Sequence, residues 1–175
     1  MDCKGKSGGL ALRWSDYVEV TVRPWCQYYI DAAIVSGGVS FRFTGIYGEP
    51  RTELRKKTWD ALAYLRRQDN LPWRCVGDFN EAMWQHEHFS RSQRSENQML
   101  LFRDCLEICE LMDLGFSGTP FTYDNRQMGD RNVRVRLDRA CADEALRDLF
   151  PFAQVVHLAS SCSDHAPIMV RLAHA

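Results

Sequence analysis

The sequence carries almost no net charge, because 22 Lys and Arg residues are offset by 23 Asp and Glu residues. Without a global positive field, any binding to nucleic acid must come from local clusters of basic residues. No stretch approaches the roughly 20 consecutive apolar residues that a membrane-crossing helix requires. The first residues, MDCKGKSGGLALRW, also lack the long apolar core of a secretory signal. We therefore expect a soluble, intracellular protein with no membrane partner.

Disulfide frameworks, repeats and linkers are also missing from the sequence. The seven cysteines are an odd number with no framework spacing, which favours a reducing environment. A length of 175 residues, with 45% apolar and 26% charged content, is ordinary for one globular domain with a real core. The sequence therefore predicts a single domain.

Several short segments have the alternation or apolar content of strands, and others have the spacing of helices. The expected strands are VEVTV (18–22), YYIDAAIV (28–35), VSFRFTGIY (39–47), WRCVGD (73–78), VRVRLDRA (133–140), AQVVHL (153–158) and PIMVRL (167–172). The expected helices are 52–67, 96–112 and 143–150. Strands and helices mix without strict alternation, which predicts an α/β (α+β) fold of packed sheets with helices outside them.

Local signals mark several of the boundaries between these segments. Gly37-Gly38 predicts an antiparallel hairpin between the second and third strands. Asp143 is the expected N-cap of the last helix, and Gly115 is a plausible stop signal after the second. The polar stretch QHEHFSRSQRSENQ (85–98) is expected to be a loop, and SGGLALRW (7–14) is expected to enter strand-like structure.

Asp78 and Asn80 follow the buried strand expected over residues 73–78. In an extended segment, residues i and i+2 point to the same side, so both side chains should project together from the strand end. A carboxylate there can accept a proton from water, and a carboxamide can orient that water or donate to an oxyanion. The alternative is that the two residues only cap the turn after the strand.

Asp164 and His165 lie in a small polar loop directly before the last expected strand. Histidine changes charge near neutral pH, so it can donate a hydrogen bond or a proton to a developing anion. The alternative interpretation is a surface histidine with no chemical role.

The stretch NVRVRLDRA (132–140) places Asp138 on one polar face with Arg134 and Arg136. One interpretation is a ladder of ion pairs on an exposed sheet face, which would contribute little to stability. The functional interpretation is that Asp138 orients a histidine while an arginine contacts phosphate.

Taken together, GDFNE (77–81), RLDRA (136–140) and SDHAP (163–167) resemble the endonuclease/exonuclease/phosphatase family, which has the DNase I-like fold shared with apurinic endonucleases. The finer resemblance is to the endonuclease domain of plant LINE-type retroelements, and it covers nearly the whole chain. It is carried by SGGLALRW (7–14), FTGIYGEP (43–50), LPWRCVGDFNE (71–81) and LGFSGTPFTYDN (114–125).

The resemblance implies a two-sheet sandwich flanked by helices, and Mg²⁺-dependent phosphodiester hydrolysis with Mn²⁺ as an alternative cation. Carried over by motif, Asp78 would activate or orient the attacking water, and Asn80 would help to position the water and the phosphate. His165 would contact the scissile phosphate and be held by Asp138. Such hydrolysis needs an in-line water, charge neutralisation and stabilisation of the leaving group.

Three further roles follow from the same resemblance. Asp164 would lie near the metal, Tyr47 would reach the phosphate through its hydroxyl, and Arg136 would contact the substrate phosphate. DNA would be the substrate and the nucleus the place of action. A reverse transcriptase region or a complementing polypeptide would be the protein partner.

The sequence departs from the family pattern at its start. The family's domain opens with a strand carrying an Asn, then a helix and a strand that delivers a Glu, the principal metal ligand. This chain begins inside the next hairpin, so residues 1–175 are expected to form one domain that lacks the N-terminal strands and helix. Glu49 and Glu81 belong to other motifs and are not expected to replace that Glu. Mg²⁺ is usually held by one or two carboxylates with waters and phosphates, so weak metal binding is expected.

Two hypotheses of different class follow from the sequence. In the first, the chain is a metal-dependent DNA endonuclease whose activity is weak or lost because the principal metal ligand is absent, or half of one that another polypeptide completes. In the second, the chain is a non-catalytic remnant that binds nucleic acid weakly or has no activity. Metal-dependent cleavage of DNA distinguishes them.

Overall fold

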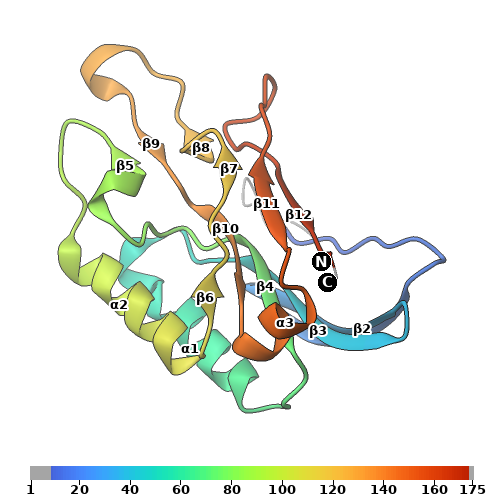
Figure 1. Ribbon diagram of the computed structural model, residues 1–175. Coiled ribbons are helices and arrows are strands. Elements are labelled where there is room, and N and C mark those ends of the chain that lie inside the picture. Colours follow the sequence, from blue (N-terminus) through green and yellow to red (C-terminus); the bar gives the residue numbers. More distant parts are fainter. Residues whose placement is uncertain (1–8, 174–175) are drawn as a thin grey trace.

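Strands from both ends of the chain meet in one six-stranded sheet, accompanied by two smaller sheets. The structure is a computed structural model that describes residues 9–173 (Figure 1). The large sheet has the order β1-β2-β3-β4-β10-β6. Its strands are β1 (Glu19–Cys26), β2 (Tyr29–Ser36), β3 (Val39–Tyr47), β4 (Trp73–Asp78), β10 (Asp138–Ala142) and β6 (Met112–Asp113).

The smaller sheets have the orders β12-β11-β7 and β5-β9-β8. Their strands are β5 (His88–Phe89), β7 (Ser117–Gly118), β8 (Tyr123–Asp124), β9 (Arg134–Val135), β11 (Gln154–His157) and β12 (Ile168–Arg171). The helices are α1 (Lys56–Arg66), α2 (Glu96–Ile108) and α3 (Glu144–Leu149), and the 3₁₀ turns are η1 (Thr52–Leu54), η2 (Gln85–Glu87) and η3 (Gly129–Arg131). Among residues 9–173, no helix has the length and apolar character needed to span a membrane.

The predicted hairpin is confirmed as β2 and β3. Ser36 pairs with Val39 in an antiparallel register, and Gly37 and Gly38 form the turn with φ of 58° and 79°. Two consecutive positive φ values are typical of a type I′ turn, which glycine adopts without steric strain. The two-residue loop therefore fixes the register of β3, the strand that ends at the candidate site.

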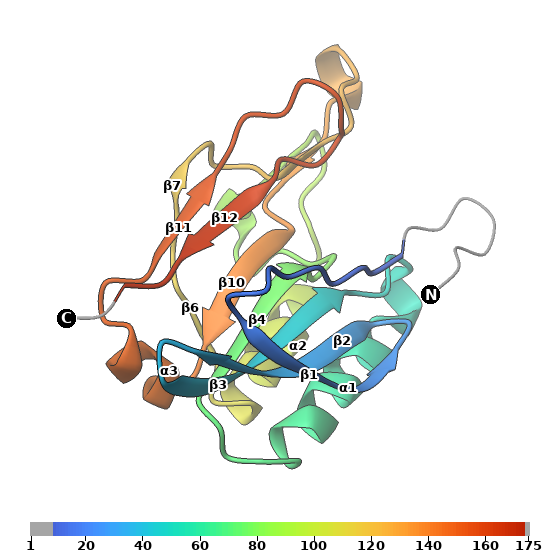
Figure 2. The same ribbon diagram turned by 90° about the vertical axis from the view of Figure 1, so that its right-hand side faces the viewer.

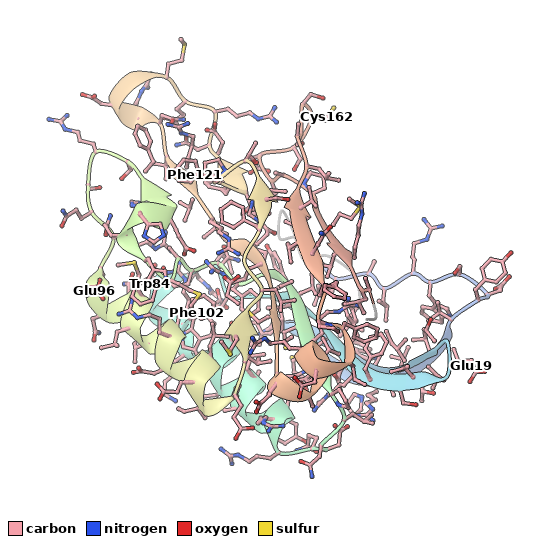
Figure 3. All side chains as sticks on the ribbon, in the orientation of Figure 1. Glu19, Trp84, Glu96, Phe102, Phe121 and Cys162 are labelled. Atoms are coloured by element: carbon pink, nitrogen blue, oxygen red, sulfur yellow. The ribbon has the colours of Figure 1, made fainter. Side chains whose placement is uncertain are left out.

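Helices α1 and α2 cover one face of the six-stranded sheet, as expected from their apolar stripes (Figure 1). Trp59 of α1 stacks on Phe102 of α2 with ring centroids 4.7 Å apart, and both belong to a core cluster that includes Trp73 and Cys75 of β4. Figure 3 shows Phe102 on the side of α2 that faces the sheet. Burial of these large rings is the main source of stability on this face.

The β11–β12 pair lies on the other side of the six-stranded sheet from α1 and α2 (Figure 2). A second core cluster, formed by Phe41, Ala142, Leu146 and Phe150, fills the space near α3. The predicted N-cap of α3 is confirmed, because the Asp143 side chain accepts a hydrogen bond from the backbone N–H of Leu146. Packed sheets with helices outside them are therefore what the structure shows.

Three sequence-based boundaries were wrong. Helix α2 ends at Ile108, because Glu110 takes a left-handed φ of 55° and the chain then enters β6, so Gly115 is not its stop signal. The polar stretch 85–98 contains η2 and β5 and the start of α2. Residues 9–15 form no strand, and residues 7 and 8 of the SGGLALRW segment lie outside the described residues.

The strand expected over 133–140 is divided between two sheets. β9 ends at Val135 and β10 begins at Asp138. Between them, the backbone N–H of Arg136 donates to the carbonyl of Glu87, 2.9 Å away. The chain therefore leaves the sheet β5-β9-β8 after Val135 and enters the six-stranded sheet at Asp138, the first residue of β10.

Candidate active site

Three candidate residues occupy paired positions at the ends of adjacent strands. Asp78 ends β4, and its register partners are Tyr47 at the end of β3 and Asp138 at the start of β10. Paired residues on neighbouring strands project from the same face of a sheet. Trp73 and Cys75 of β4 face the helices, so alternation places Asp78 on the opposite face, toward the β11–β12 pair.

His165 reaches this row from the loop before β12. Its Nδ1 lies 2.8 Å from Oδ2 of Asp138, and its Nε2 lies 4.0 Å from Oδ2 of Asp78. The His165 backbone forms an antiparallel bridge with Tyr123, whose ring centroid is 5.2 Å from the imidazole. The structure thus brings Asp78, Asp138 and His165 together around one space, as the sequence motifs predict.

The surroundings of this group shift the pKa of Asp78 and the pKa of His165. Burial and the neighbouring Asp138 carboxylate raise the pKa of Asp78 to about 6. The hydrogen bond to Asp138 raises the pKa of His165 above its usual value, although burial opposes this change. The side chains of Asp78 and Asp138 are 12% and 14% exposed, whereas that of His165 is 32% exposed and accessible to a ligand.

Asn80 reaches the site through a turn, which corrects the expectation of an extended segment. Its φ is 55°, and its backbone N–H donates to Oδ1 of Asp78 at 2.7 Å. Its side-chain Nδ2 donates to the carbonyl of Gly48 at 2.8 Å. Asp78 therefore caps the turn after the strand, which was the alternative interpretation of this motif. Its second oxygen, Oδ2, faces His165. The two interpretations of the GDFN motif are compatible.

Gly77 allows this turn to pack against β3. Its φ is 144°, and a Cβ at this position would collide with the backbone carbonyl of Ile46. Gly48 has a similar role, because a Cβ there would collide with the backbone of Phe79. Two close backbone approaches thus require glycine beside Asp78.

Thr122 joins the two halves of the site, and sequence reasoning missed it. Its side chain is fully buried, and its Oγ1 accepts hydrogen bonds from the backbone N–H groups of Leu137 and Asp138, both at 2.9 Å. Its carbonyl accepts from the backbone N–H of Ala166 at 2.7 Å. One residue therefore holds the backbone at Asp138 and next to His165. Thr122 lies within the LGFSGTPFTYDN stretch, but nothing in that stretch singled out this threonine.

Arg136 does not occupy the predicted phosphate position. It is 4% exposed, and its two terminal nitrogens bond to Glu87 at 3.0 Å and to Asp113 at 2.8 Å. Arg139 binds the same two carboxylates. Although burial opposes ionisation of Glu87, the charges of Arg139 and Arg136 keep its pKa below the usual value. Arg136 therefore belongs to a buried ion-pair network, because both of its terminal nitrogens already have partners.

Two other arginines lie behind the Asp78 turn. Arg55 and Arg94 each bond to Glu81, whose side chain is fully buried, and Arg94 also donates to the carbonyl of Asn80 at 3.2 Å. The positive charge of Arg55 opposes the rise in the pKa of Asp78. Their distant positions in the sequence gave no signal that they belong to the site.

Asp164 borders a neighbouring hollow of about 470 Å³, lined also by Tyr123, Asp124 and Arg126. Its side chain is exposed, and its Oδ1 accepts from the Ser163 hydroxyl at 3.4 Å. Within residues 9–173, no group of three or more His, Cys, Asp or Glu side chains is arranged to hold a metal ion. These residues therefore do not form a metal centre on their own, and the metal role of Asp164 stays a prediction.

Tyr47 lies in register with Asp78, and its role stays a prediction. It is half-buried at the end of β3, beside Asp78. Its hydroxyl makes no hydrogen bond to another described residue. A second hollow, of about 460 Å³, lies by Trp84, Phe116 and Arg136 rather than at the Asp78–His165 space.

Comparison with known proteins identifies the family and the fold. The profile of the Endonuclease/Exonuclease/phosphatase family matches residues 4–165, whereas no curated protein matches the sequence itself. Among solved structures, the endonuclease domain of TRAS1, a telomere-specific non-LTR retrotransposon, is 17% identical with a TM-score of 0.64, and the match covers 91% of this chain and 70% of that one. AP endonuclease LMAP from Leishmania major is 15% identical with a TM-score of 0.67, covering 85% of this chain and 55% of that one.

A beta toxin from Staphylococcus aureus with bound magnesium ions is 11% identical with a TM-score of 0.52, and the match covers 82% of this chain and 54% of that one. The chain thus spans about half the length of two of these three neighbours. Likeness at such low identity shows the fold, which is DNase I-like. Because the family profile covers most of the sequence, the chain belongs to the Endonuclease/Exonuclease/phosphatase family.

Proposed function

We propose that the chain hydrolyses phosphodiester bonds of DNA, as an endonuclease of the retroelement type. The observation that carries this proposal is the space between Asp78 and His165, whose Oδ2 and Nε2 face each other across 4.0 Å. That separation is too long for a direct hydrogen bond, but one oxygen atom could lie about 2.8 Å from both groups. A water molecule has the size and polarity to occupy this position, because it can donate a hydrogen bond to the Asp78 carboxylate and accept one from His165.

The two pKa shifts fit opposite roles in hydrolysis. With its pKa raised to about 6, Asp78 is ionised at neutral pH and is a better proton acceptor than an ordinary aspartate. His165, with its pKa raised by Asp138, keeps its proton to a higher pH and can donate it. The oxygen of a water attacks phosphorus as its proton passes to Asp78, the bond to the leaving oxygen breaks, and that oxygen takes up a proton from solvent. His165 donates a hydrogen bond to the phosphate.

Asn80 and Asp138 act on these two groups. Asp138 bonds to Nδ1 of His165 and so aims Nε2 at the phosphate. Asn80 uses its amide nitrogen to hold the carbonyl of Gly48, which leaves its amide oxygen to orient the water. Tyr47 lies in register with Asp78 and, in this proposal, contacts the phosphate through its hydroxyl.

We further propose that hydrolysis depends on Mg²⁺ or Mn²⁺, and that the chain alone is a weak enzyme. A divalent cation would neutralise charge on the phosphate, and Asp164 is the predicted ligand. The residues of the described range do not form a metal centre on their own. A further carboxylate, supplied by a complementing polypeptide, is therefore expected to raise the rate. A reverse transcriptase region is the other proposed partner.

Plasmid nicking by the purified chain tests this function. With MgCl₂ we expect slow conversion of supercoiled to nicked DNA, and no conversion in EDTA. Asp78→Ala and His165→Ala should each reduce the rate by about 100-fold or more, because each removes one side of the space around the phosphate. Asp60→Ala is the control, since Asp60 is 62% exposed on α1 and its ion pair is with Lys56, one turn away on the same helix.

Two results would contradict the proposal. If Asp78→Ala nicked DNA as fast as the parent chain, the space between Asp78 and His165 would not be the active site. If the chain bound DNA but never cleaved it with Mg²⁺ or Mn²⁺, a non-catalytic binding role would replace hydrolysis.

A further inference from the structure

The loop between β11 and β12 carries His165 but contributes few apolar contacts. Residues 160–165 include four serines or cysteines, and residues 161–164 are exposed. Cys162 lies at the tip of this loop (Figure 3). A polar surface loop of this kind is ordinarily mobile, because little apolar area is buried to hold it. Yet the His165 imidazole must stay in register with two side chains of the large sheet.

Arg126, in the segment between β8 and β9, binds the backbone of this loop. Its Nη1 donates to the carbonyl of Ser161 at 3.0 Å, and its Nη2 donates to the carbonyl of Ser163 and, at 3.5 Å, to that of Ser160. Figure 2 shows the loop after β11 reaching the turn between β8 and β9. One guanidinium therefore donates hydrogen bonds to three backbone carbonyls. Its planar shape and its several fixed N–H donors suit it to bind several acceptors at once.

The contact with Ser163 leads directly to the histidine. The Ser163 hydroxyl accepts a hydrogen bond from the backbone N–H of His165 at 3.1 Å, and the backbone N–H of Ser163 donates to the Ser160 hydroxyl at 3.2 Å. Arg126 thus fixes the two serines that shape the turn before His165. Sequence patterns gave no indication of this, because Arg126 is 39 positions from His165.

Arg126 is itself held in place by the hairpin that the antiparallel strands β8 and β9 form. It has a left-handed φ of 54°, and its backbone N–H donates to Oδ1 of Asp124 at 2.8 Å. The backbone N–H of Asp124 in turn donates to the carbonyl of Asp164 at 2.9 Å. The β8–β9 hairpin is therefore bonded to the β11–β12 loop in two places. One is the backbone hydrogen bond to Asp164, and the other is the set of hydrogen bonds from the Arg126 side chain.

From these contacts we infer that Arg126 is a positioning residue, which holds the Ser160–Ser163 turn so that His165 faces Asp78 and Asp138. This inference rests on the proposed hydrolytic function of the site. Arg126 does not contact the reacting atoms in this role. Its removal is expected to affect the placement of the imidazole, and hence turnover, more than the binding of DNA.

The test compares Arg126→Ala, Arg126→Lys and Arg131→Ala in the full chain. Arg131 is exposed in the same segment, so its replacement makes the same change in charge without removing the loop contacts. For nicking of plasmid DNA, we expect kcat of Arg126→Ala to fall about 10-fold with little change in KM, since small displacements of a catalytic group are costly. Arg126→Lys should recover part of the loss, and Arg131→Ala should match the parent chain.

Hydrogen exchange gives a readout that does not need activity. The backbone amides of Asp124, Ser163 and Ala166 should exchange faster in Arg126→Ala than in Arg131→Ala, while those of β3 should not change. Unaltered exchange at these amides would overturn the positioning role even if the chain cleaved no DNA. If exchange rose but kcat stayed at the parent value, the contact would hold the loop without positioning His165, and the inference would also be wrong. Should Arg126→Ala fail to fold, Arg126→Lys carries the same two measurements.

Discussion

At the scale of single residues, Asp78 holds a charge in an unfavourable place. It is largely buried and beside a second carboxylate, which is why its pKa rises to about 6. A folded-state pKa above the unfolded value means that the folded protein binds more protons between about pH 4 and pH 6. The free energy of unfolding therefore falls as pH rises through this window, and at neutral pH the ionised carboxylate reduces stability.

Asp78→Asn should therefore stabilise the chain while abolishing hydrolysis. The change removes the buried charge, and the amide oxygen can still accept the hydrogen bond from Asn80. We expect a gain of about 1–3 kcal/mol in the free energy of unfolding at pH 8, and a much smaller gain at pH 4, where the native carboxyl is protonated. Urea unfolding at both pH values measures this. Asp60→Asn is the control on an exposed carboxylate, and an equal gain at both pH values would refute the explanation.

The sequence predicted which residues form the candidate site better than it predicted which residues they contact. The sequence pointed to Asp78, Asp138 and His165 because each lies in a short motif at a strand end, and the structure brings them together. It misplaced Arg136, because alternation along a strand cannot reveal that Glu87 and Asp113 lie beneath it. Charged partners that come from distant segments leave no local pattern.

At the scale of elements, the end of β4 depends on a close approach to β3. Gly77 has a φ that L side chains rarely adopt, and its missing side chain leaves room for the Ile46 carbonyl. Gly45 of β3 differs, since an added Cβ would have its nearest neighbour at 3.6 Å, an ordinary contact. Two glycines of the same sheet thus have different tolerance to substitution.

Gly77→Ala is accordingly expected to lower the free energy of unfolding by more than about 3 kcal/mol, because both steric overlap and backbone strain arise. Gly45→Ala should change it by no more than about 1 kcal/mol. Chemical denaturation of the two variants makes the comparison. Equal losses in both would show that the site does not require the close packing of β4 on β3.

Elements were predicted well where local signals were complete. The β2–β3 hairpin and the N-cap of α3 each have their defining residues within a few positions. The division of 133–140 into β9 and β10 had no such signal, because it depends on the Arg136 N–H meeting Glu87, a residue that local sequence placed in a loop. Tertiary contacts overrode a clear period-two pattern there.

At the scale of the whole molecule, the two faces of the six-stranded sheet differ in how much apolar surface they bury. The face covered by α1 and α2 buries a broad cluster that includes Trp59, Trp73 and Phe102. The sheet β12-β11-β7 lies on the other side, where the cluster around Phe41 is smaller. β3 is paired on both edges, while β12 pairs only with β11 among the described strands. Local opening should therefore be easier in the sheet β12-β11-β7 than in the six-stranded sheet.

Native-state hydrogen exchange should reveal this difference. We expect the amides of β3 and β4 to be the most protected and those of β12 to exchange at least about 10-fold faster, because little apolar area holds the edge strand. Mass spectrometry of peptic fragments can separate these strands. If β12 were as protected as β3, the two sheets would open as one unit and the account would be wrong.

The register of β4 links the integrity of the fold to its chemistry. A slip by one position would turn Asp78 toward the helices and expose Trp73, since neighbouring residues of a strand face opposite ways. The same error would separate the carboxylate from both Tyr47 and Asp138. Once the proposed hydrolysis is measured, the fraction of molecules able to turn over is expected to count those that have folded with β4 in register.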